Sequence, residues 1–496
     1  MCGIIGVIGP KNLGQLNWAS YEVYRGLLTL QHRGQDASGI LSYDTDRKKF
    51  YGHKDLGLVS QVFEKRNIEK LTGPLALGHT RYATTGSDER DDLQPLVTGI
   101  PFGVGMVHNG NILNYHPLAR EMSDELDLQL LTNNDLEILL HLWCQHFLRS
   151  TNGEKVKFNF EEAYKAAEKV FGKVEGAYAV VGTVAEKGLI GFRDPNGIRP
   201  LVLGKKSIEG EGECYCLGSE TLALNFLGYE YVRDIEPGEF IFIDFEGTIK
   251  SKIYRKEEIV KAPCMFEWIY FSGAESSFET QSVYGARLNL GRVLARKIRK
   301  LIEQGEVSPD IVCPVPDTSR TASIALAENL GLPYREGLIK NRYVHRSFIL
   351  NTQEKREKAV ELKLSPVRSE IEGKSILLVD DSVVRGTTSK KIIDLLKRYG
   401  AKDITLAITC PPIRYGCFYG IDFPKAEDLI ANGKNIDEIA NWVGANKVIF
   451  LDENETREAI GISELCMACI NNKYPTSIKS GEEFAEKRNE HKEPIR

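Results

Sequence analysis

An apolar run followed by a polar loop and a helix limits the fold of this chain more than any other feature. Residues 376–379 are four apolar residues in a row, as in a strand that is buried on both faces. The loop 380–389 is polar, and the helical segment 390–399 ends in front of Gly400, a usual helix stop. Helix, strand and helix also alternate earlier, over 288–304, 311–315 and 322–330. This alternation predicts a parallel α/β sheet.

The first half of the chain has a different pattern. Short alternating or apolar runs, such as 177–182 and 240–243, recur there between turn residues, with a few helices such as 136–148. We expect a strand-rich α+β domain with helices laid on its sheets. A chain of 496 residues is too long for one core, so more than one domain is expected. The change of pattern predicts a domain over 2–255, a second over 256–465, and a C-terminal segment with a polar tail over 466–496.

Charge and hydropathy exclude several kinds of partner. The 64 basic and 69 acidic side chains are well mixed and give a net charge of -5, so no basic stripe is available for a nucleic acid. No stretch approaches the roughly 18 uninterrupted apolar residues of a membrane span. The apolar run at the N-terminus is short, is broken by glycine and has no basic segment ahead of it, which argues against a secretory signal. We therefore expect a cytoplasmic protein that binds neither nucleic acid nor membrane.

The loop 380–389 has the composition of a phosphate site. It lies between the carboxyl end of a strand and the amino end of a helix, where backbone N–H groups and the helix dipole attract a phosphate. Gly386 permits close approach, and residues 387–389 add hydroxyl donors. The paired Asp380 and Asp381 would repel a phosphate, so sugar hydroxyls or Mg²⁺ suit them better. The alternative is a simple turn with a helix cap.

This loop resembles the signature of the type I phosphoribosyltransferases, a family that binds 5-phosphoribosyl-1-pyrophosphate (PRPP). The resemblance implies that Asp380 and Asp381 face the ribose hydroxyls and Mg²⁺. It implies a 5-phosphate site formed by Ser382, Arg385, Gly386, Thr387 and Thr388. The loop 314–320 resembles the pyrophosphate loop of the family, with Thr318 as a further Mg²⁺ contact. The basic stretch that follows, by composition a solvated segment, resembles the flap over the pyrophosphate, with contacts from Lys340, Arg342, Tyr343 and Arg346.

A cysteine stands directly behind the initiator methionine. If Met1 is removed, Cys2 carries a nucleophilic thiol and a free α-amino group on one residue. An amine with an ordinary pKa of about 7.7 to 8.0 can accept a proton near neutral pH, so no separate histidine base is required. Taken alone, Cys2 is more simply a small hydrophobic residue at the start of a strand.

Three further segments, 30–39, 78–86 and 108–111, favour the catalytic interpretation of Cys2. Together with residues 2–4 they resemble the N-terminal-nucleophile (Ntn) glutamine amidotransferases. The resemblance implies an Ntn-hydrolase αββα sandwich in which Cys2 attacks the carboxamide of glutamine. It implies that the oxyanion is stabilised by Asn109 and the Gly110 N–H. It also assigns the glutamine-binding site: Arg81 to the α-carboxylate, Asp135 to the α-ammonium group, and Arg33 as a brace at the Cys2 end.

A chain that combines these two halves resembles the glutamine PRPP amidotransferase family. This similarity implies that PRPP, glutamine and water give 5-phosphoribosylamine, glutamate and pyrophosphate, the first committed step of de novo purine biosynthesis. Ammonia would pass internally, since free ammonia is largely protonated in the cytoplasm. The family also implies purine nucleotides as feedback inhibitors and a homotetramer or homodimer. The segments 192–201 and 264–270 also resemble this family, but their residue types alone suggest no role for them. Residues 133–137 read Asn-Asn-Asp-Leu-Glu, where relatives commonly have Ser-Asp-Ser-Glu.

Ten cysteines in a reducing compartment suggest catalysis or metal binding rather than disulfides. The Cys-x-x-Cys pair at 466 and 469 fits a zinc site, a redox pair or an iron–sulfur site, and its spacing does not choose between them. One branch of the amidotransferase family holds a [4Fe–4S] cluster through cysteines at four matching places. The resemblance therefore implies, as cluster ligands, Cys264, Cys417, Cys466 and Cys469.

Two other functions fit parts of the sequence. A glutamine-dependent hexosamine synthase shares the first half but needs a sugar-isomerase second half, which the segment 380–388 argues against. A regulatory protein could bind PRPP as a signal without catalysis. The Cys2 constellation and the lack of a basic DNA-binding module argue against that function.

Overall fold

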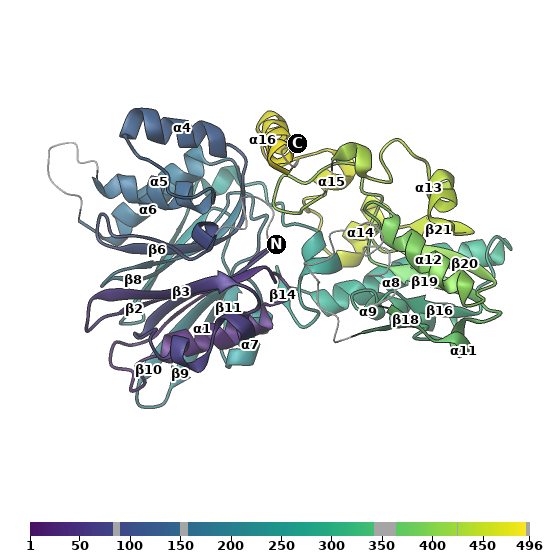
Figure 1. The fold of residues 1–496 in the computed structure, drawn as a ribbon, viewed down its shortest axis with the longest axis horizontal. Coiled ribbons are helices and arrows are strands. Elements are labelled where there is room, and N and C mark those ends of the chain that lie inside the picture. The colour runs from purple at the N-terminus through teal and green to yellow at the C-terminus, as the bar shows by residue number, and fades with distance from the viewer. Residues whose placement is uncertain (83–89, 149–156, 342–363, 424, 493–496) are drawn as a thin grey trace.

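The fold consists of two halves that lie side by side, with the N-terminus near the junction between them (Figure 1). The structure is a computed structural model and describes residues 1–82, 90–148, 157–341, 364–423 and 425–492. None of the helices in these ranges has the length and apolar character needed to cross a membrane.

The N-terminal half contains two antiparallel sheets. In spatial order the first sheet is β11 (Glu230–Asp234), β9 (Val202–Ile208), β10 (Gly212–Gly218), β1 (Gly3–Ile8), β4 (Leu75–Arg81), β2 (Ala37–Asp44) and β3 (Lys49–Leu56). The second is β13 (Ile249–Ile253), β12 (Glu239–Asp244), β8 (Gly188–Arg193), β7 (Gly176–Val184), β6 (Val104–Ile112) and β5 (Leu96–Thr98). The chain enters at β1, in the middle of the first sheet, because β1 pairs with both β10 and β4.

The two sheets pack face to face and carry helices on their outer faces. Ile4, Leu77, Val181 and Ile241 belong to the apolar layer between the sheets. Helices α1 (Trp18–Thr29) and α7 (Thr221–Leu227) lie against the first sheet, and α5 (Leu136–Leu148) and α6 (Phe160–Lys173) lie against the second (Figure 1). The short helices α2 (Val59–Val62) and α3 (Lys65–Ile68) and the longer α4 (Tyr115–Leu126) complete this half. The predicted αββα sandwich is confirmed.

The C-terminal half is built on a parallel sheet, as predicted. Its strands lie in the order β16 (Ile311–Pro314), β19 (Ser375–Asp380), β20 (Asp403–Ile408) and β21 (Lys447–Phe450). The helices packed around them are α8 (Val283–Glu303), α9 (Arg320–Leu330), α12 (Thr387–Arg398), α13 (Ile436–Val443) and α14 (Glu453–Ile460). Smaller elements are the pair β14 (Ser277–Phe278) and β15 (Gln281–Ser282), the pair β17 (Leu338–Lys340) and β18 (Leu364–Pro366), and α11 (Arg368–Ile371).

Three helices begin earlier than their apolar pattern predicts, and one of them is α9, which begins at Arg320 rather than 322. Helix α8 begins at Val283 rather than 288, because the side chain of Ser282 accepts a hydrogen bond from the Gly285 N–H and caps it. Helix α12 begins at Thr387 rather than 390, directly after Gly386, which has a φ of 74°. Threonine is poor in helix interiors but suits a first turn, so periodicity alone misses these positions.

The C-terminal segment folds back onto both halves. Cys466 forms a parallel β-bridge with Cys264, and helices α15 (Ala468–Asn471) and α16 (Ile478–Lys492) follow it. Most of the predicted polar tail forms α16, whose Gly481 packs against Phe418. Lys487 of α16 borders a groove whose other lining residues come from α4 and the loop after it, in the N-terminal half. In Figure 1 the helix α16 accordingly lies above the junction.

Candidate active site

Cys2 directly precedes β1 of the first sheet and contacts β6 of the second. Its backbone N–H donates a hydrogen bond to Asn109 Oδ1 at 3.1 Å, and Asn109 belongs to β6 of the second sheet. The Cys2 Sγ lies 3.9 Å from the Tyr82 carbonyl oxygen. Met1 precedes it in the wall of a large cavity. Removal of Met1 would therefore leave the Cys2 α-amino group beside Asn109 and open toward that cavity.

Asn109 and Gly110 have the properties of an oxyanion-stabilising pair. The Nδ2 atom of Asn109 is buried and has no hydrogen-bond partner within the described ranges, so a donor is left over beside Cys2. Gly110 has a φ of 156°, and a Cβ at this position would lie 1.9 Å from the Ala177 carbonyl oxygen. Only glycine fits there, which keeps the backbone of the strand close to its neighbour. A buried donor without a partner costs free energy unless a ligand satisfies it.

Arg81 and Asp135 reach the same region from different elements. Arg81 ends β4, next to β1, and its side chain is buried. Asp135 directly precedes α5; its Oδ2 accepts a hydrogen bond from the Ile112 N–H at 2.9 Å, and its Oδ1 lies 3.2 Å from His108 Nε2. Burial, with His108 and Arg81 close by, lowers the pKa of His79 well below its usual range. The site therefore holds one guanidinium and one carboxylate beside two buried imidazoles.

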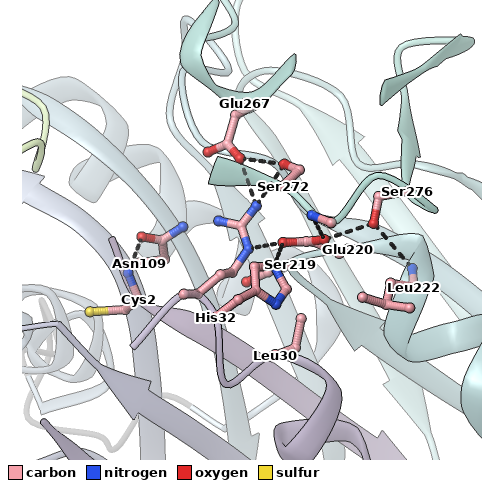
Figure 2. A network of polar contacts seen from close by, with 12 residues as sticks. Cys2, Leu30, His32, Asn109, Ser219, Glu220, Leu222, Glu267, Ser272 and Ser276 are labelled. Atoms are coloured by element: carbon pink, nitrogen blue, oxygen red, sulfur yellow. Dashed lines mark hydrogen bonds and ion pairs between the residues drawn. The ribbon is translucent and has the colours of Figure 1, made fainter. Parts of the chain in front are cut away.

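Arg33 joins the two halves through buried ion pairs. Its Nε contacts Glu220 Oε1, and its Nη2 lies 2.6 Å from Glu267 Oε2 and 3.1 Å from Ser272 Oγ. Glu220 belongs to the sandwich, whereas Glu267 and Ser272 belong to the segment that follows it (Figure 2). These bonds are consistent with the predicted role of Arg33, which is to hold the Cys2 end of the site in place. They engage the guanidinium with protein carboxylates, so they do not favour a direct contact between Arg33 and glutamine.

Glu220, like Arg33, has several partners in the same buried network of polar contacts. Its Oε1 also lies 2.8 Å from His32 Nε2, and its Oε2 accepts hydrogen bonds from the Gly273 N–H and the Ser276 hydroxyl (Figure 2). Burial opposes ionisation, but Arg33 and His32 outweigh it and lower the pKa of Glu220 to about 2. Glu220 therefore stays charged, and the network fixes the first residues of the C-terminal half beside Cys2.

The predicted phosphate loop lies at the carboxyl edge of the parallel sheet. Asp381 Oδ1 accepts a hydrogen bond from the Ser382 hydroxyl at 2.9 Å, and its Oδ2 accepts one from Thr318. Burial and the adjacent Asp381 carboxylate raise the pKa of Asp380 well above its usual range, and burial also raises the pKa of Asp381. Such a carboxyl pair favours a bound divalent cation, which would offset the repulsion.

The two loops expected to bind PRPP face one cavity. Residues 380–389 line it together with residues 315–318 of the second loop, so Ser382, Arg385, Gly386, Thr387 and Thr388 share its wall with Thr318. Lys340 also lines it, and its Nζ lies 2.5 Å from Asp317 Oδ2. The other predicted flap contacts, Arg342, Tyr343 and Arg346, lie outside the described residues.

This cavity extends from one candidate site to the other. Its volume is about 1260 Å³. On the side of the sandwich its wall contains Met1, Gly34 and Tyr82, and on the opposite side it contains the carboxyl pair Asp380 and Asp381. The two candidate sites therefore border one continuous cavity, which is partly open to solvent.

The four cysteines expected to bind a cluster gather in one buried region. Cys264 and Cys466 lie side by side in their β-bridge, and the Tyr419 N–H donates to Cys417 Sγ at 3.3 Å. Burial and the nearby thiols, Cys417 foremost, raise the pKa of Cys469 well above its ordinary value. Four cysteine thiols are the usual ligands of an iron–sulfur cluster. No three metal-binding side chains in the described part of the chain stand in ligating geometry, so binding would require these thiols to reorient.

The segments 192–201 and 264–270, for which the sequence suggests no role, lie at the junction between the halves. Arg193 donates hydrogen bonds to the carbonyl oxygens of Gly197 and Arg199, and the buried Asp194 accepts hydrogen bonds from the backbone N–H groups of Tyr178 and Ile198. The turn they hold presents Arg199, whose guanidinium contacts the Tyr419 carbonyl oxygen and lies 3.7 Å from Glu267. Both segments are therefore structural supports. The sequence gives no signal for the contacts of Arg199, because Tyr419 and Glu267 are far from it in the chain.

Two family models match the chain. The one described as a glutamine amidotransferase domain matches residues 79–225, and the one described as a phosphoribosyl transferase domain matches residues 281–418. The matches fall in different halves of the structure.

Full-length relatives match as well. The amidophosphoribosyltransferase of Escherichia coli is 41% identical over 460 residues, which are 93% of this chain and 88% of the relative. That of Methanocaldococcus jannaschii is 38% identical over 493 residues, covering 96% and 98% of the two chains. The solved structure of the glutamine PRPP amidotransferase from B. subtilis, complexed with ADP and GMP, has a TM-score of 0.82 at 37% identity and covers 96% and 98%. A structure described as the allosteric regulatory enzyme of purine biosynthesis has a TM-score of 0.83 at 37% identity.

Proposed function

The chain belongs to the amidophosphoribosyltransferase family, and on that premise we propose which of its residues carry out each part of the reaction. The enzyme transfers the amide nitrogen of glutamine to PRPP and forms 5-phosphoribosylamine, glutamate and pyrophosphate, the first committed step of de novo purine biosynthesis. We propose that residues 2–255 form the glutaminase domain, 256–465 the phosphoribosyltransferase domain, and 466–496 a cluster-binding segment with a polar tail. The end of β13 at Ile253 supports the first boundary.

The glutaminase reaction begins with attack of Cys2 Sγ on the carboxamide carbon of glutamine. The α-amino group, freed by removal of Met1, takes the thiol proton and passes it to the departing ammonia. The tetrahedral oxyanion accepts hydrogen bonds from Asn109 Nδ2 and the Gly110 N–H, after which water hydrolyses the thioester to glutamate. The single observation that carries this assignment is the Asn109 Nδ2 donor, which is buried beside Cys2 and has no partner in the described ranges.

Recognition of glutamine requires opposite charges for its two α-groups. Arg81 pairs with the α-carboxylate and Asp135 with the α-ammonium group, while Arg33 holds the Cys2 end through its ion pairs with Glu220 and Glu267. The burial of Arg81 and the position of Asp135 beside β6 support these roles.

The phosphoribosyl reaction takes place at the opposite end of the cavity. The backbone and hydroxyl groups of residues 382–388 hold the 5-phosphate of PRPP, and Asp380 and Asp381 accept hydrogen bonds from the ribose hydroxyls. Mg²⁺, when bound by Thr318, Asp380 and Asp381, would neutralise the leaving pyrophosphate. Lys340, with Arg342, Tyr343 and Arg346, adds contacts to the pyrophosphate. Ammonia arrives through the cavity and attacks C1 from the face opposite the pyrophosphate.

The test of this function is the dependence of glutaminase activity on PRPP. Glutamate release from glutamine is measured on anaerobically purified protein with Mg²⁺, with and without PRPP, and pyrophosphate is measured in the same samples. We expect strong stimulation by PRPP and equal amounts of glutamate and pyrophosphate. Glutamate release that is indifferent to PRPP would mean that the second half has another acceptor or only a regulatory role.

A [4Fe–4S] cluster held by Cys264, Cys417, Cys466 and Cys469 is part of the proposal. The shared burial of the four thiols and their position at the junction support a structural role for it. Nearby backbone bonds support the same role, since the Arg414 and Tyr415 N–H groups both donate to the Cys469 carbonyl oxygen.

Replacement of Cys466 by alanine is expected to remove bound iron and the brown absorbance of anaerobically purified protein. The reason is that three thiolates hold such a cluster poorly and that Cys466 also positions Cys264. Iron, zinc and sulfide are measured by elemental analysis, with Cys144→Ala as the control because Cys144 lies in α5, within the sandwich. Zinc without iron in the wild type would contradict the cluster.

The proposal also covers the regulation of the enzyme, its oligomeric state and its location in the cell. The relative from B. subtilis is complexed with ADP and GMP, which supports inhibition of this enzyme by purine nucleotides. We propose a homotetramer or homodimer in the cytoplasm, which light scattering of the purified protein and cell fractionation would test.

A further inference from the structure

We propose that Gln94 and His108 are positioning residues of the glutamine site: Gln94 fixes His108 as the neutral Nε2–H tautomer, and His108 holds the Asp135 carboxylate for the α-ammonium group of glutamine. The inference rests on the proposed glutaminase function. It assigns roles to two buried residues for which the sequence gives none.

The orientation of the Gln94 amide follows from the backbone. The His108 N–H donates a hydrogen bond to Gln94 Oε1 at 2.8 Å, and an N–H group can face only an acceptor. The oxygen of the amide is thereby fixed, so its nitrogen must be the atom that lies 2.8 Å from His108 Nδ1. Both side chains are buried, with 3% of Gln94 and 4% of His108 exposed, so solvent does not replace these bonds.

The tautomer of His108 follows from the amide. The nitrogen of Gln94 carries only donors, so Nδ1 of His108 must offer a lone pair. A neutral imidazole then carries its proton on Nε2, the atom that lies 3.2 Å from Asp135 Oδ1. An imidazolium would place an N–H on Nδ1 against the N–H of Gln94, which is repulsive. The contact with Gln94 therefore fits an imidazole whose Nδ1 carries the lone pair.

Asp135 gains a defined position without losing its charge. One of its oxygens accepts a hydrogen bond from the Ile112 N–H, and the other lies 3.2 Å from His108 Nε2, a buried atom that has no hydrogen-bond partner in the described ranges. Neutral donors orient a carboxylate but leave its net charge available for a cation. His108 and Ile112 belong to β6, which also carries Asn109. One strand therefore sets the distance between the oxyanion donor and the group that meets the α-ammonium.

The departure from the usual sequence at residue 134 fits the same arrangement. The second N–H of the Gln94 amide lies 3.3 Å from Asn134 Oδ1, which also accepts from the Leu136 N–H at the start of α5. The Asn134 Nδ2 donates in turn to the Asp92 carbonyl oxygen at 2.6 Å. The hydrogen bonds of Gln94 thus connect β6 to the loop that carries Asp135. The side-chain amide of Asn134 supplies the acceptor for one of them.

The kinetic test uses Gln94→Glu, which keeps the shape of the side chain. A carboxylate oxygen facing Nδ1 would draw a proton onto that nitrogen, so His108 would either lose the Nε2 proton or become an imidazolium that competes with the substrate ammonium for Asp135. We expect the KM for glutamine to rise about tenfold with little change in kcat, because an interaction common to ground and transition states is weakened. Rates are normalised to ammonia-dependent synthesis in the same sample.

Glutaramate, which is glutamine without its α-ammonium group, separates positioning from a general disturbance. Its kcat/KM should be the same in the wild type and in Gln94→Glu, since Asp135 has no cation to bind. Equal losses with glutamine and glutaramate, or no loss with either, would overturn the proposal. The control Gln129→Glu makes the same change at an exposed position and should leave both substrates unaffected.

A spectroscopic measurement tests the geometry without a variant of Gln94. Nitrogen-15 NMR of ring-labelled histidine, assigned by loss of the signal in His108→Gln, should report an unprotonated Nδ1 and a protonated Nε2 at pH 7. A protonated Nδ1 would overturn the proposal. A wild-type enzyme that released no glutamate from glutamine would contradict the proposed function, and the NMR result would still decide the tautomer.

Discussion

Replacing Cys2 by alanine should lower glutamine-dependent synthesis of 5-phosphoribosylamine by roughly 10³-fold or more, the usual order for loss of a catalytic nucleophile. Synthesis from ammonium chloride at high pH should persist, because the phosphate loop and the carboxyl pair lie at the other end of the cavity. The measurement compares pyrophosphate formation with glutamine and with ammonia as the nitrogen source.

The ratio of the two activities makes this test specific to the nucleophile. Cys144→Ala is the matched control, since it removes another thiol of the sandwich that has no assigned role. Equal loss of both activities in Cys2→Ala would refute the two-site arrangement. Mass spectrometry of the purified wild type should show that Met1 has been removed, because the proposed proton relay uses the Cys2 α-amino group.

Replacing Asp381 by asparagine should weaken the apparent affinity for PRPP by roughly 10- to 100-fold. This corresponds to the loss of charged contacts worth about 1.5–3 kcal/mol. Asparagine keeps the size of the side chain and can still hydrogen-bond to Thr318 and Ser382. The change therefore removes the charge that would bind Mg²⁺ and the ribose hydroxyls, without emptying the space.

The measurement is the PRPP concentration that half-saturates ammonia-dependent synthesis at fixed free Mg²⁺. Asp437→Asn, which lies exposed in α13, is the matched control. An unchanged saturation curve in Asp381→Asn would count against the assigned role. Because ammonia replaces glutamine in this assay, a defect in the glutaminase site cannot cause the change.

The shared cavity gives the two reactions a physical reason to occur in one chain. Ammonia released into bulk solvent near neutral pH is largely protonated and loses its nucleophilic lone pair. The junction that borders the cavity is held by Arg33 with Glu220 and Glu267, so the same residues that brace Cys2 also attach the second half. Breaking a buried ion pair of this kind by removing one partner typically costs about 3–5 kcal/mol.

Local patterns predicted several of the elements correctly. The apolar run at 136–148 predicted α5 with its observed bounds, and the run at 376–379 predicted the central strand β19. The loop 380–389 also faces a cavity, as its composition indicated. Such features are readable because strand, turn and helix signals depend on residues that are neighbours in the chain.

The sequence by itself determined the two domain types, through motifs that resemble known families, and it predicts Cys2 as the nucleophile and 380–389 as the phosphate loop. Only the tertiary structure decided which side chains meet across the chain: Arg33 with Glu220 and Glu267, Gln94 with His108, and Cys264 with Cys466. The partners in these sets are 14 to 234 residues apart. A buried polar group must find a partner somewhere, but composition and periodicity do not say where, because the packing of the two sheets and the two halves makes that choice.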